Sequence, residues 1–318
     1  MLYMRFCLIF IAFLTVSEAF GQYRWDVGVA LGASNYLGEI GGQEQTRRDF
    51  LYDMKLNRTQ YVFGAFVRYK ASPQLAINFG INHGRIRGND ENSLNPARVA
   101  RNLSFRNDIT EFSLRGEFTL FYDNDAGGRG FYNPDFRIFG FLGAAVFHHN
   151  PQARYYGELE AFNGEMIDLR PLQTEGVAYN NWEFAVPAGI GVFFTYNKVH
   201  RFGWELGYRF TFTDYLDDIS AQYVAHPPGS LAAEMAHRTT PEALARAEQL
   251  ALSQGTEVPN AGSFAPGEKR GDPTNNDGFL FTQFTYSYVL GGKSTFAKRK
   301  YRYLKGKKRV RRKTRAKF

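Results

Sequence analysis

The 318-residue sequence predicts an all-β protein, an eight-stranded antiparallel transmembrane β-barrel of the outer-membrane type with long extracellular loops. Three observations predict this fold. Several segments alternate strictly between apolar and polar or small side chains, the connections between them alternate in length, and an aromatic content of 16% accompanies a mean hydropathy of only −0.39. A barrel strand turns every second residue to lipid, so its hydropathy stays far below that of a transmembrane helix.

The clearest alternating segment is residues 202–213. One row of side chains is entirely apolar or aromatic, and the other contains only Gly, Glu, Arg and Thr. Alternation with a period of two residues is typical of a strand, and these two rows predict a strand between lipid and a polar lumen. The apolar row consists of Phe202, Trp204, Leu206, Tyr208, Phe210 and Phe212.

Seven further segments show a related pattern, which gives eight predicted strands. Because proline cannot donate a backbone hydrogen bond, Pro187 on the inner row of the sixth strand predicts a bulge. In chain order the predicted strands are residues 25–34, 59–70, 74–87, a segment after residue 107 that includes Phe112 and Leu120, 136–147, 182–196, 202–213 and 279–290.

The connections between these strands alternate in length. Outer-membrane barrels have short periplasmic turns and long extracellular loops, so the alternation supports the count of eight and predicts that both termini are periplasmic. The longest loop contains Thr240-Pro241, a typical helix start, and predicts a short helix near 241–253. The long connections are residues 35–58, 88–107, 148–181 and 214–278.

The N-terminal residues 1–21 predict a secretory signal peptide. Arg5 precedes an apolar run at 6–16, which is too short to span a membrane, and small residues stand near position 21. The mature barrel domain is then expected at 22–292, and it contains no cysteine because the only one, Cys7, lies in the signal peptide. This composition predicts a chain without disulfide or thiolate chemistry.

A strongly basic tail, residues 293–318, follows the barrel. It contains 14 of the 39 Lys and Arg residues and no acid, which leaves 25 basic against 31 acidic residues in the rest of the chain. In the periplasm such a tail would bind an acidic protein, anionic lipid headgroups or acidic cell-wall polymer, rather than nucleic acid; the alternative is a solvated disordered tail. The predicted partner-binding residues are Lys298, Arg299, Lys300, Arg302, Lys305, Lys307, Lys308, Arg309, Arg311, Arg312 and Lys313.

The inner rows of the predicted strands carry charges of alternating sign. An eight-stranded barrel leaves an interior that side chains just fill, so we expect ion pairs that plug the lumen; a proton or solute path is the alternative. The predicted lumen charges are Arg68, Glu111, Arg115, Glu117, Glu183, Glu205 and Arg209.

Catalytic and metal signals are weak, and the sequence assigns no catalytic residue, cofactor or metal ligand. His148 and His149 could belong to a hydrolase or metal site, but adjacent residues on a strand point to opposite faces. The acidic segment 213–218 could hold calcium, although it lacks the regular ligand spacing of an EF-hand. We instead expect a solvated or arginine-paired strand cap that faces Arg101 or Arg106.

Five short sequence motifs at the strand and loop junctions resemble those of the PorG-like outer-membrane barrels of Bacteroidota. They lie within residues 35–41, 101–106, 147–151, 169–176 and 212–218. The resemblance implies a non-enzymatic subunit of the type IX secretion system, which exports proteins and in some species supports gliding. In that family the barrel is thought to anchor a periplasmic ring of a lipoprotein and its partner subunit to the outer membrane. The motif residues are Tyr36, Gly38, Glu39, Arg101, Asn102, Phe105, Arg106, Asn150, Pro151, Asp214, Tyr215, Asp217 and Asp218.

Two other functions remain open from the residues alone. A lipid-modifying barrel enzyme would use His148 or His149, and a surface adhesin would act through the loop 214–278.

Overall fold

The computed structural model describes residues 24–40, 58–123, 135–197, 199–258 and 264–290. The predicted signal peptide, 1–21, and the predicted basic tail, 293–318, lie outside the described residues.

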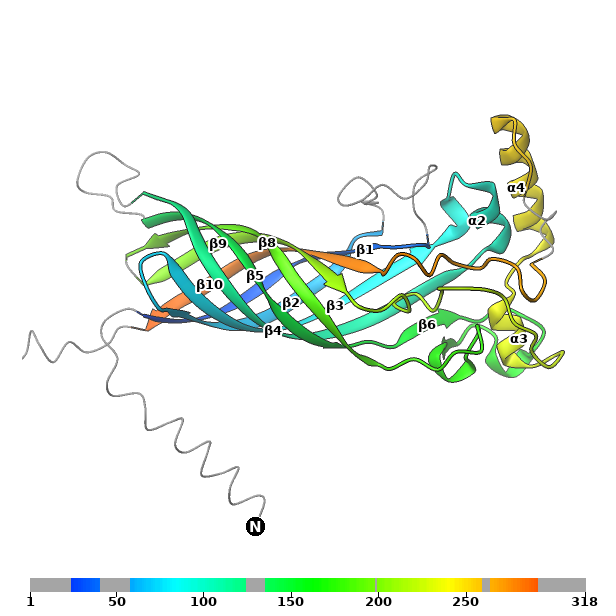
Figure 1. Cartoon of the computed structure of the whole chain (residues 1–318), viewed down its shortest axis with the longest axis horizontal. Helices are drawn as coiled ribbons and strands as arrows, with labels where there is room; N and C mark the ends of the chain where they lie inside the picture. The colour runs from blue at the N-terminus through cyan, green and yellow to red at the C-terminus, as the bar shows by residue number, and fades with distance from the viewer. Residues whose placement is uncertain (1–23, 41–57, 124–134, 198, 259–263, 291–318) are drawn as a thin grey trace, which may run out of the picture.

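Eight long strands form one closed antiparallel barrel, as the sequence predicts (Figure 1). Each strand pairs with its neighbour, β1 pairs with β10, and β3 pairs with β4, so the sheet has no open edge around the barrel. The barrel strands are β1 (Trp25–Leu37), β2 (Gln60–Lys70), β3 (Leu75–Asn89), β4 (Ser104–Asp123), β5 (Asp135–His148), β8 (Trp182–Tyr196), β9 (His200–Thr211) and β10 (Gly278–Leu290).

The two ends of the barrel differ (Figure 1). At the turn end, residues 71–74 and 197–199 make short connections, and β1 begins opposite the last residue of β10. At the loop end, the long connections carry further helices and strands. This arrangement matches the predicted alternation of short and long connections.

The barrel exterior is apolar along all eight strands. Leu31 of β1 is 64% exposed, Phe184 of β8 62% and Phe284 of β10 73%. The side chains that alternate with these exposed rows point into the lumen. Large apolar side chains exposed all around a protein are stable only in contact with lipid or another apolar surface. The exterior of this barrel therefore has the surface of a membrane-spanning one.

The hairpin of β3 and β4 is longer than the sequence predicts. β3 continues to Asn89 and β4 begins at Ser104, so the register Asn89↔Ser104 to Gly84↔Ile109 extends the hairpin at the loop end. The added residues of the two strands contain no lipid-facing row of aromatic side chains. The alternating sequence pattern therefore does not reveal this extension of the hairpin.

The predicted bulge at Pro187 was wrong. Pro187 pairs with Arg209 of β9 in an unbroken register, and the ladder to β5 keeps the same register on both sides of it. The missing donor of the proline interrupts the ladder without inserting a residue. A register shift occurs instead in β4, between Thr119 and Phe121.

The loop end contains small elements that pack on one another. Helix α4 lies where a helix was predicted; Thr240 caps its N-terminus, and its Ala247 packs against Val99 of α2. Among the residues that the structure describes, no helix is long and apolar enough to cross a membrane. These elements are α2 (Pro96–Arg101), α3 (Leu231–Ala236), α4 (Pro241–Gln254), β6 (Pro151–Arg154), β7 (Met166–Asp168) and the 3-10 turns η4 (Asp90–Asn92), η5 (Glu160–Phe162) and η6 (Arg170–Leu172).

Candidate functional site: the filled lumen and closed mouth of the barrel

Buried ion pairs fill the lumen. Arg68 contacts three carboxylates, with distances of 3.1 Å to Asp26, 2.6 Å to Glu117 and 3.3 Å to Glu205. All four residues are at most 5% exposed. A buried charge is stable only when paired and hydrogen-bonded, so these contacts make the lumen a packed interior rather than a water channel.

The same network continues along the barrel axis. Arg115 binds Glu205 at 2.9 Å, Arg209 binds Glu111 at 2.9 Å, and Arg201 binds Asp26 at 2.7 Å. The network thus pairs four arginines with four carboxylates. The predicted lumen charges take part except Glu183, which is only half-buried and joins none of these pairs.

Aromatic rings complete the filling of the lumen. The guanidinium carbon of Arg209 lies 4.2 Å from the ring centre of Phe281, and that of Arg115 lies 4.6 Å from the ring centre of Phe141. Arginine stacks well on aromatic faces and is less strongly hydrated than lysine. These stacked pairs explain why the buried cations of this lumen are arginines.

At the loop end, the lumen is closed by a group that we call the mouth cluster: Tyr36, Asp217 and Asp277. The Tyr36 hydroxyl lies 2.6 Å from Oδ2 of Asp217 and 2.7 Å from Oδ1 of Asp277, and it accepts the backbone N–H of Glu39 at 3.0 Å. The ring of Tyr36 packs edge-on against Phe105 of β4. The mouth cluster therefore joins the end of β1, the segment after β9 and the residue before β10.

The protons of the mouth cluster can be counted. A tyrosine hydroxyl has one proton, so Tyr36 donates to one aspartate, and the second short contact requires a proton on the other carboxyl group. Burial and the neighbouring Glu39 raise the pKa of Asp217 well above its usual range. Burial and Asp217 do the same to the pKa of Asp277. The short contacts and the raised pKa values together favour a proton held between the two carboxyl groups.

Gly38 lies against this cluster. A Cβ atom at this position would be 2.1 Å from both the Tyr36 hydroxyl and Oδ1 of Asp277. Only glycine leaves room for the three oxygen atoms to meet, which gives a physical reason for the glycine at position 38.

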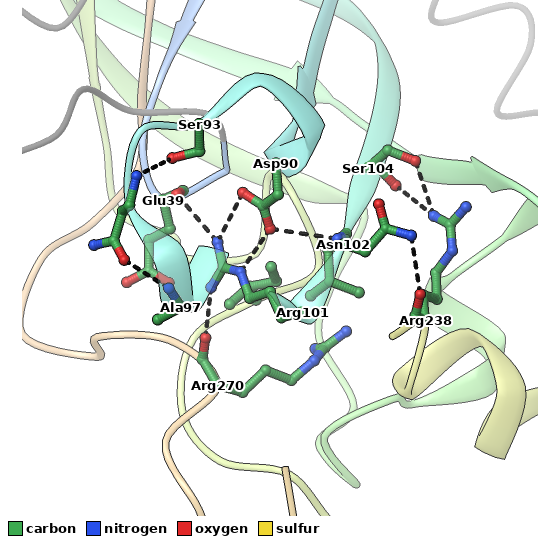
Figure 2. Close-up of polar contacts among 12 residues, drawn as sticks. Glu39, Asp90, Ser93, Ala97, Arg101, Asn102, Ser104, Arg238 and Arg270 are labelled. Carbon is green, nitrogen blue, oxygen red and sulfur yellow. Dashed lines mark hydrogen bonds and ion pairs between the residues drawn. The ribbon is translucent and has the colours of Figure 1, made fainter. Parts of the chain in front are cut away.

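Beside the mouth cluster, Arg101 holds three segments together, as Figure 2 shows. Its guanidinium donates to both carboxylate oxygens of Asp90, at 2.6 and 3.3 Å, to the carbonyl of Arg270 at 2.7 Å and to the carbonyl of Glu39 at 3.2 Å. Asn102 ends α2 in the left-handed conformation and donates to the carbonyl of Arg238 at 3.1 Å. Short polar links of this kind fix the loops without a large apolar core.

The acidic segment 213–218 is largely buried and is arginine-paired, which is one of the two predicted arrangements, but its partner is not a predicted one. Its arginine partner is Arg270, which lies 3.8 Å from Oδ2 of Asp218 and 3.0 Å from Glu175. The predicted partners lie elsewhere: Arg101 binds Asp90, and Arg106 binds Asp108. The long loop between the strands brings Arg270 back over the mouth, and residue spacing could not reveal that return.

Asp218 is held by hydroxyl groups as well. It accepts hydrogen bonds from Thr174 at 2.5 Å and Tyr179 at 2.6 Å, and the ring of Tyr179 stacks on Tyr215 with centres 4.6 Å apart. Burial, followed by the charge of Asp218, raises the pKa of Tyr179. Thr174 and Tyr179 thus satisfy the carboxylate of Asp218. Among the described residues no group of His, Cys, Asp and Glu has the arrangement of a metal site.

A family model described as "Domain of unknown function (DUF6089)" matches residues 4–225, which is more than half of the chain. The chain belongs to the DUF6089 family. No curated protein sequence matches it. The matched part of this DUF6089 protein contains seven of the eight barrel strands together with Tyr36 and Asp217, whereas Asp277 and β10 follow it.

Three solved structures are similar to the chain. The N-terminal barrel domain of OprF from Pseudomonas aeruginosa is 7% identical, with a TM-score of 0.32, and covers 85% of this chain and 100% of its own. Ail of Yersinia pestis, with the heparin analogue sucrose octasulfate, is 8% identical, with a TM-score of 0.33 and coverages of 84% and 98%. The outer membrane protein OprG of Pseudomonas aeruginosa is 9% identical, with a TM-score of 0.30 and coverages of 85% and 96%.

The motif residues of the DUF6089 chain fall into two groups. Tyr36, Gly38, Phe105 and Asp217 meet at the mouth cluster, and Glu39 and Arg101 lie beside it. Asn150 and Pro151 lie away from the cluster. Asn150 donates to Asp168 at 3.0 Å, and Pro151 begins β6. Asp277, Arg270 and Glu175 also belong to the closed mouth, although they are not among the predicted motif residues.

The two histidines considered for catalysis in the DUF6089 chain have structural contacts. His149 is fully buried; its Nδ1 lies 3.4 Å from the amide nitrogen of Asn107, and burial lowers its pKa to about 4. His148 points elsewhere, and its Nε2 lies 3.0 Å from the amide nitrogen of Asn181. The structure therefore does not bring the two imidazoles together as one site.

Proposed function

We propose that this protein is an integral outer-membrane barrel that works without catalysis as an anchoring subunit of the type IX secretion machinery. The observation that carries the anchoring role is the filled lumen, in which four arginines pair with four buried carboxylates. A barrel without an open lumen cannot act as a general diffusion pore. A filled barrel can still hold a partner at the membrane, and anchoring is the role that we propose for it.

The secretion role rests on the resemblance of the five junction motifs to those of PorG-like barrels. Several of their residues, including Tyr36, Gly38 and Asp217, build the mouth cluster. Buried hydrogen bonds between separate segments hold the barrel mouth in one arrangement, which suits an anchor better than a moving gate.

The partners in this proposal are the periplasmic ring proteins, a lipoprotein and its partner subunit. The turn end carries the first residue of β1 and the last residue of β10, and the sequence that follows β10 contains 14 Lys and Arg residues at 293–318. If the turn end is periplasmic, the tail supplies electrostatic docking to an acidic ring surface, and the apolar exterior supplies the anchor. The tail residues Lys298 to Lys313 act together in this proposal.

Mass spectrometry of co-purifying proteins tests the proposal. The full-length chain and a version that ends at Gly292 are extracted gently from native membranes, with Arg246→Gln, at the loop end, as a control that leaves the tail intact. We expect periplasmic ring proteins with the full-length chain and the control, and their depletion with the truncated chain. If no version carries a periplasmic protein, the anchoring role is wrong.

A further inference from the structure

A cavity of about 470 Å³ opens at the loop end, beside Arg101. It lies between the end of β1, helix α2 and residues 269–275, in the region drawn in Figure 2. Arg101 and Arg270 at its floor are buried, whereas Lys269 and Asn275 at its rim are exposed. It is the size of a small-molecule site, large enough for one or two sugar rings.

Three atoms of the residues that line this cavity are buried without a hydrogen-bond partner among the described residues: Nη1 of Arg98, Nε of Arg270 and Oε2 of Glu39. The other carboxylate oxygen of Glu39 accepts the backbone N–H of Asp272. Buried polar atoms are nearly always hydrogen-bonded, so an unpaired donor and an unpaired acceptor in one cavity indicate a ligand that satisfies both.

The cavity is lined by four cations, Arg98, Arg101, Lys269 and Arg270, and by two carboxylates, Glu39 and Asp272. Arg101 and Arg270 are neutralised by Asp90 and Glu175, which lie outside the cavity lining. Arg98 and Lys269 form no ion pair with any residue within the described ranges. Glu39 and Asp272 attract Arg98 and Lys269 respectively without a direct ion pair. Both cations therefore keep donors for an anionic group, while Glu39 and the backbone around Gly271 leave polar positions for hydroxyl groups.

We propose that this cavity binds a small acidic carbohydrate, a sugar that carries a carboxylate or phosphate group. Arg98 and Lys269 would hold the anionic group, and Glu39 would accept a hydrogen bond from a sugar hydroxyl. Guanidinium groups bind carboxylate and phosphate with directed, charge-assisted hydrogen bonds. The proposal goes beyond the anchoring function and does not depend on it.

Calorimetric titration of the purified full-length protein in detergent tests the site with four probes: glucuronate, glucose 6-phosphate, glucose and inorganic phosphate. We expect saturable binding of at least one acidic sugar, and binding weaker by about ten-fold or more for glucose and for inorganic phosphate. Equal binding of inorganic phosphate and glucose 6-phosphate would show a simple anion site and overturn the carbohydrate proposal. Saturable binding of none of the probes would overturn the site altogether.

Substitutions of lining residues test whether the sugar binds in this cavity. Arg98→Gln and Glu39→Gln should each weaken binding of the acidic sugar by about ten-fold. Lys269→Gln should weaken it as well, and because Lys269 is exposed this variant keeps the test valid if the substitutions of the half-buried Arg98 and Glu39 impair folding. Arg246→Gln is the matched control, since Arg246 lies at the same end, pairs with Glu91 on the surface and does not line the cavity. Unchanged affinity in Lys269→Gln and in folded Arg98→Gln would place the binding elsewhere and refute the proposal.

Discussion

The Tyr36 hydroxyl lies 2.6 Å from Oδ2 of Asp217, a residue 181 positions later in the chain. Asp277 approaches the same hydroxyl from a third segment. This single oxygen therefore connects three loop-end segments, and the closure of the barrel mouth depends on it.

Removal of that hydroxyl should loosen the loop end. In Tyr36→Phe, two buried carboxyl groups lose a shared partner, and an unsatisfied buried group of this kind costs about 1–3 kcal/mol. We expect faster amide hydrogen exchange in the segment after β9 and a lower unfolding temperature. Tyr156→Phe is the control, because Tyr156 is 70% exposed. Equal exchange rates in the two variants would contradict the role of Tyr36.

The closed mouth should lose stability as the pH rises. Burial raises the pKa values of Asp217 and Asp277 in the folded protein, whereas an aspartate in an unfolded chain titrates near about 3.9. A group whose pKa is raised on folding binds more protons when folded, so its contribution is complete below about pH 4 and disappears as the pH passes the raised values.

Hydrogen exchange of the loop-end amides between about pH 5 and 9, corrected for the intrinsic rate, measures this effect; the range lies above the aspartate value of the unfolded chain. Asp277→Asn keeps a neutral side chain at every pH and should flatten the profile. Glu248→Gln, an exposed substitution on α4, should leave the slope unchanged. A flat profile in the unmodified protein would show that the pair carries no shared proton.

The barrel was predictable because its pattern is local. Every strand alternates between lipid and lumen with a period of two residues, so residues 202–213 and 182–196 reveal their faces without any long-range information. Asp26 and Arg201 follow the same rule. Both lie on inner rows, and this position could have indicated that they join the lumen network.

The closed mouth was less predictable because its contacts are long-range and aperiodic. Arg270 meets Glu175 across 95 residues, and Tyr36 meets Asp277 across 241. Only the end of a strand and the length of a loop constrain such contacts, and neither states which arginine reaches which carboxylate. The expectation that Arg101 or Arg106 faces the acidic segment failed for this reason.

The lumen network should respond strongly to the loss of one partner. Arg209→Met leaves Glu111 buried without its cation, which should lower the free energy of unfolding by about 3–5 kcal/mol. The double variant with Glu111→Leu should recover much of the loss, since an apolar pair of similar volume avoids the buried charge. Arg246→Met breaks only an exposed pair and should cost less than about 1 kcal/mol. Urea unfolding in detergent micelles, followed by tryptophan fluorescence, compares the four proteins.

Substitution of His149 tests whether the protein acts as an anchor or as an enzyme. Its imidazole is buried between Phe147 and Tyr179, and a pKa of about 4 keeps it neutral at physiological pH. If its role is packing, His149→Phe in native cells should keep secretion of an exported reporter protein close to normal, and His148→Ala should have no effect. Membrane levels of each variant must match the unmodified protein, so that a folding loss is not mistaken for a functional one. A secretion defect at normal membrane level would show that an imidazole takes part in the function, as the lipid-modifying alternative requires; altered lipid A in the same cells would then identify the reaction.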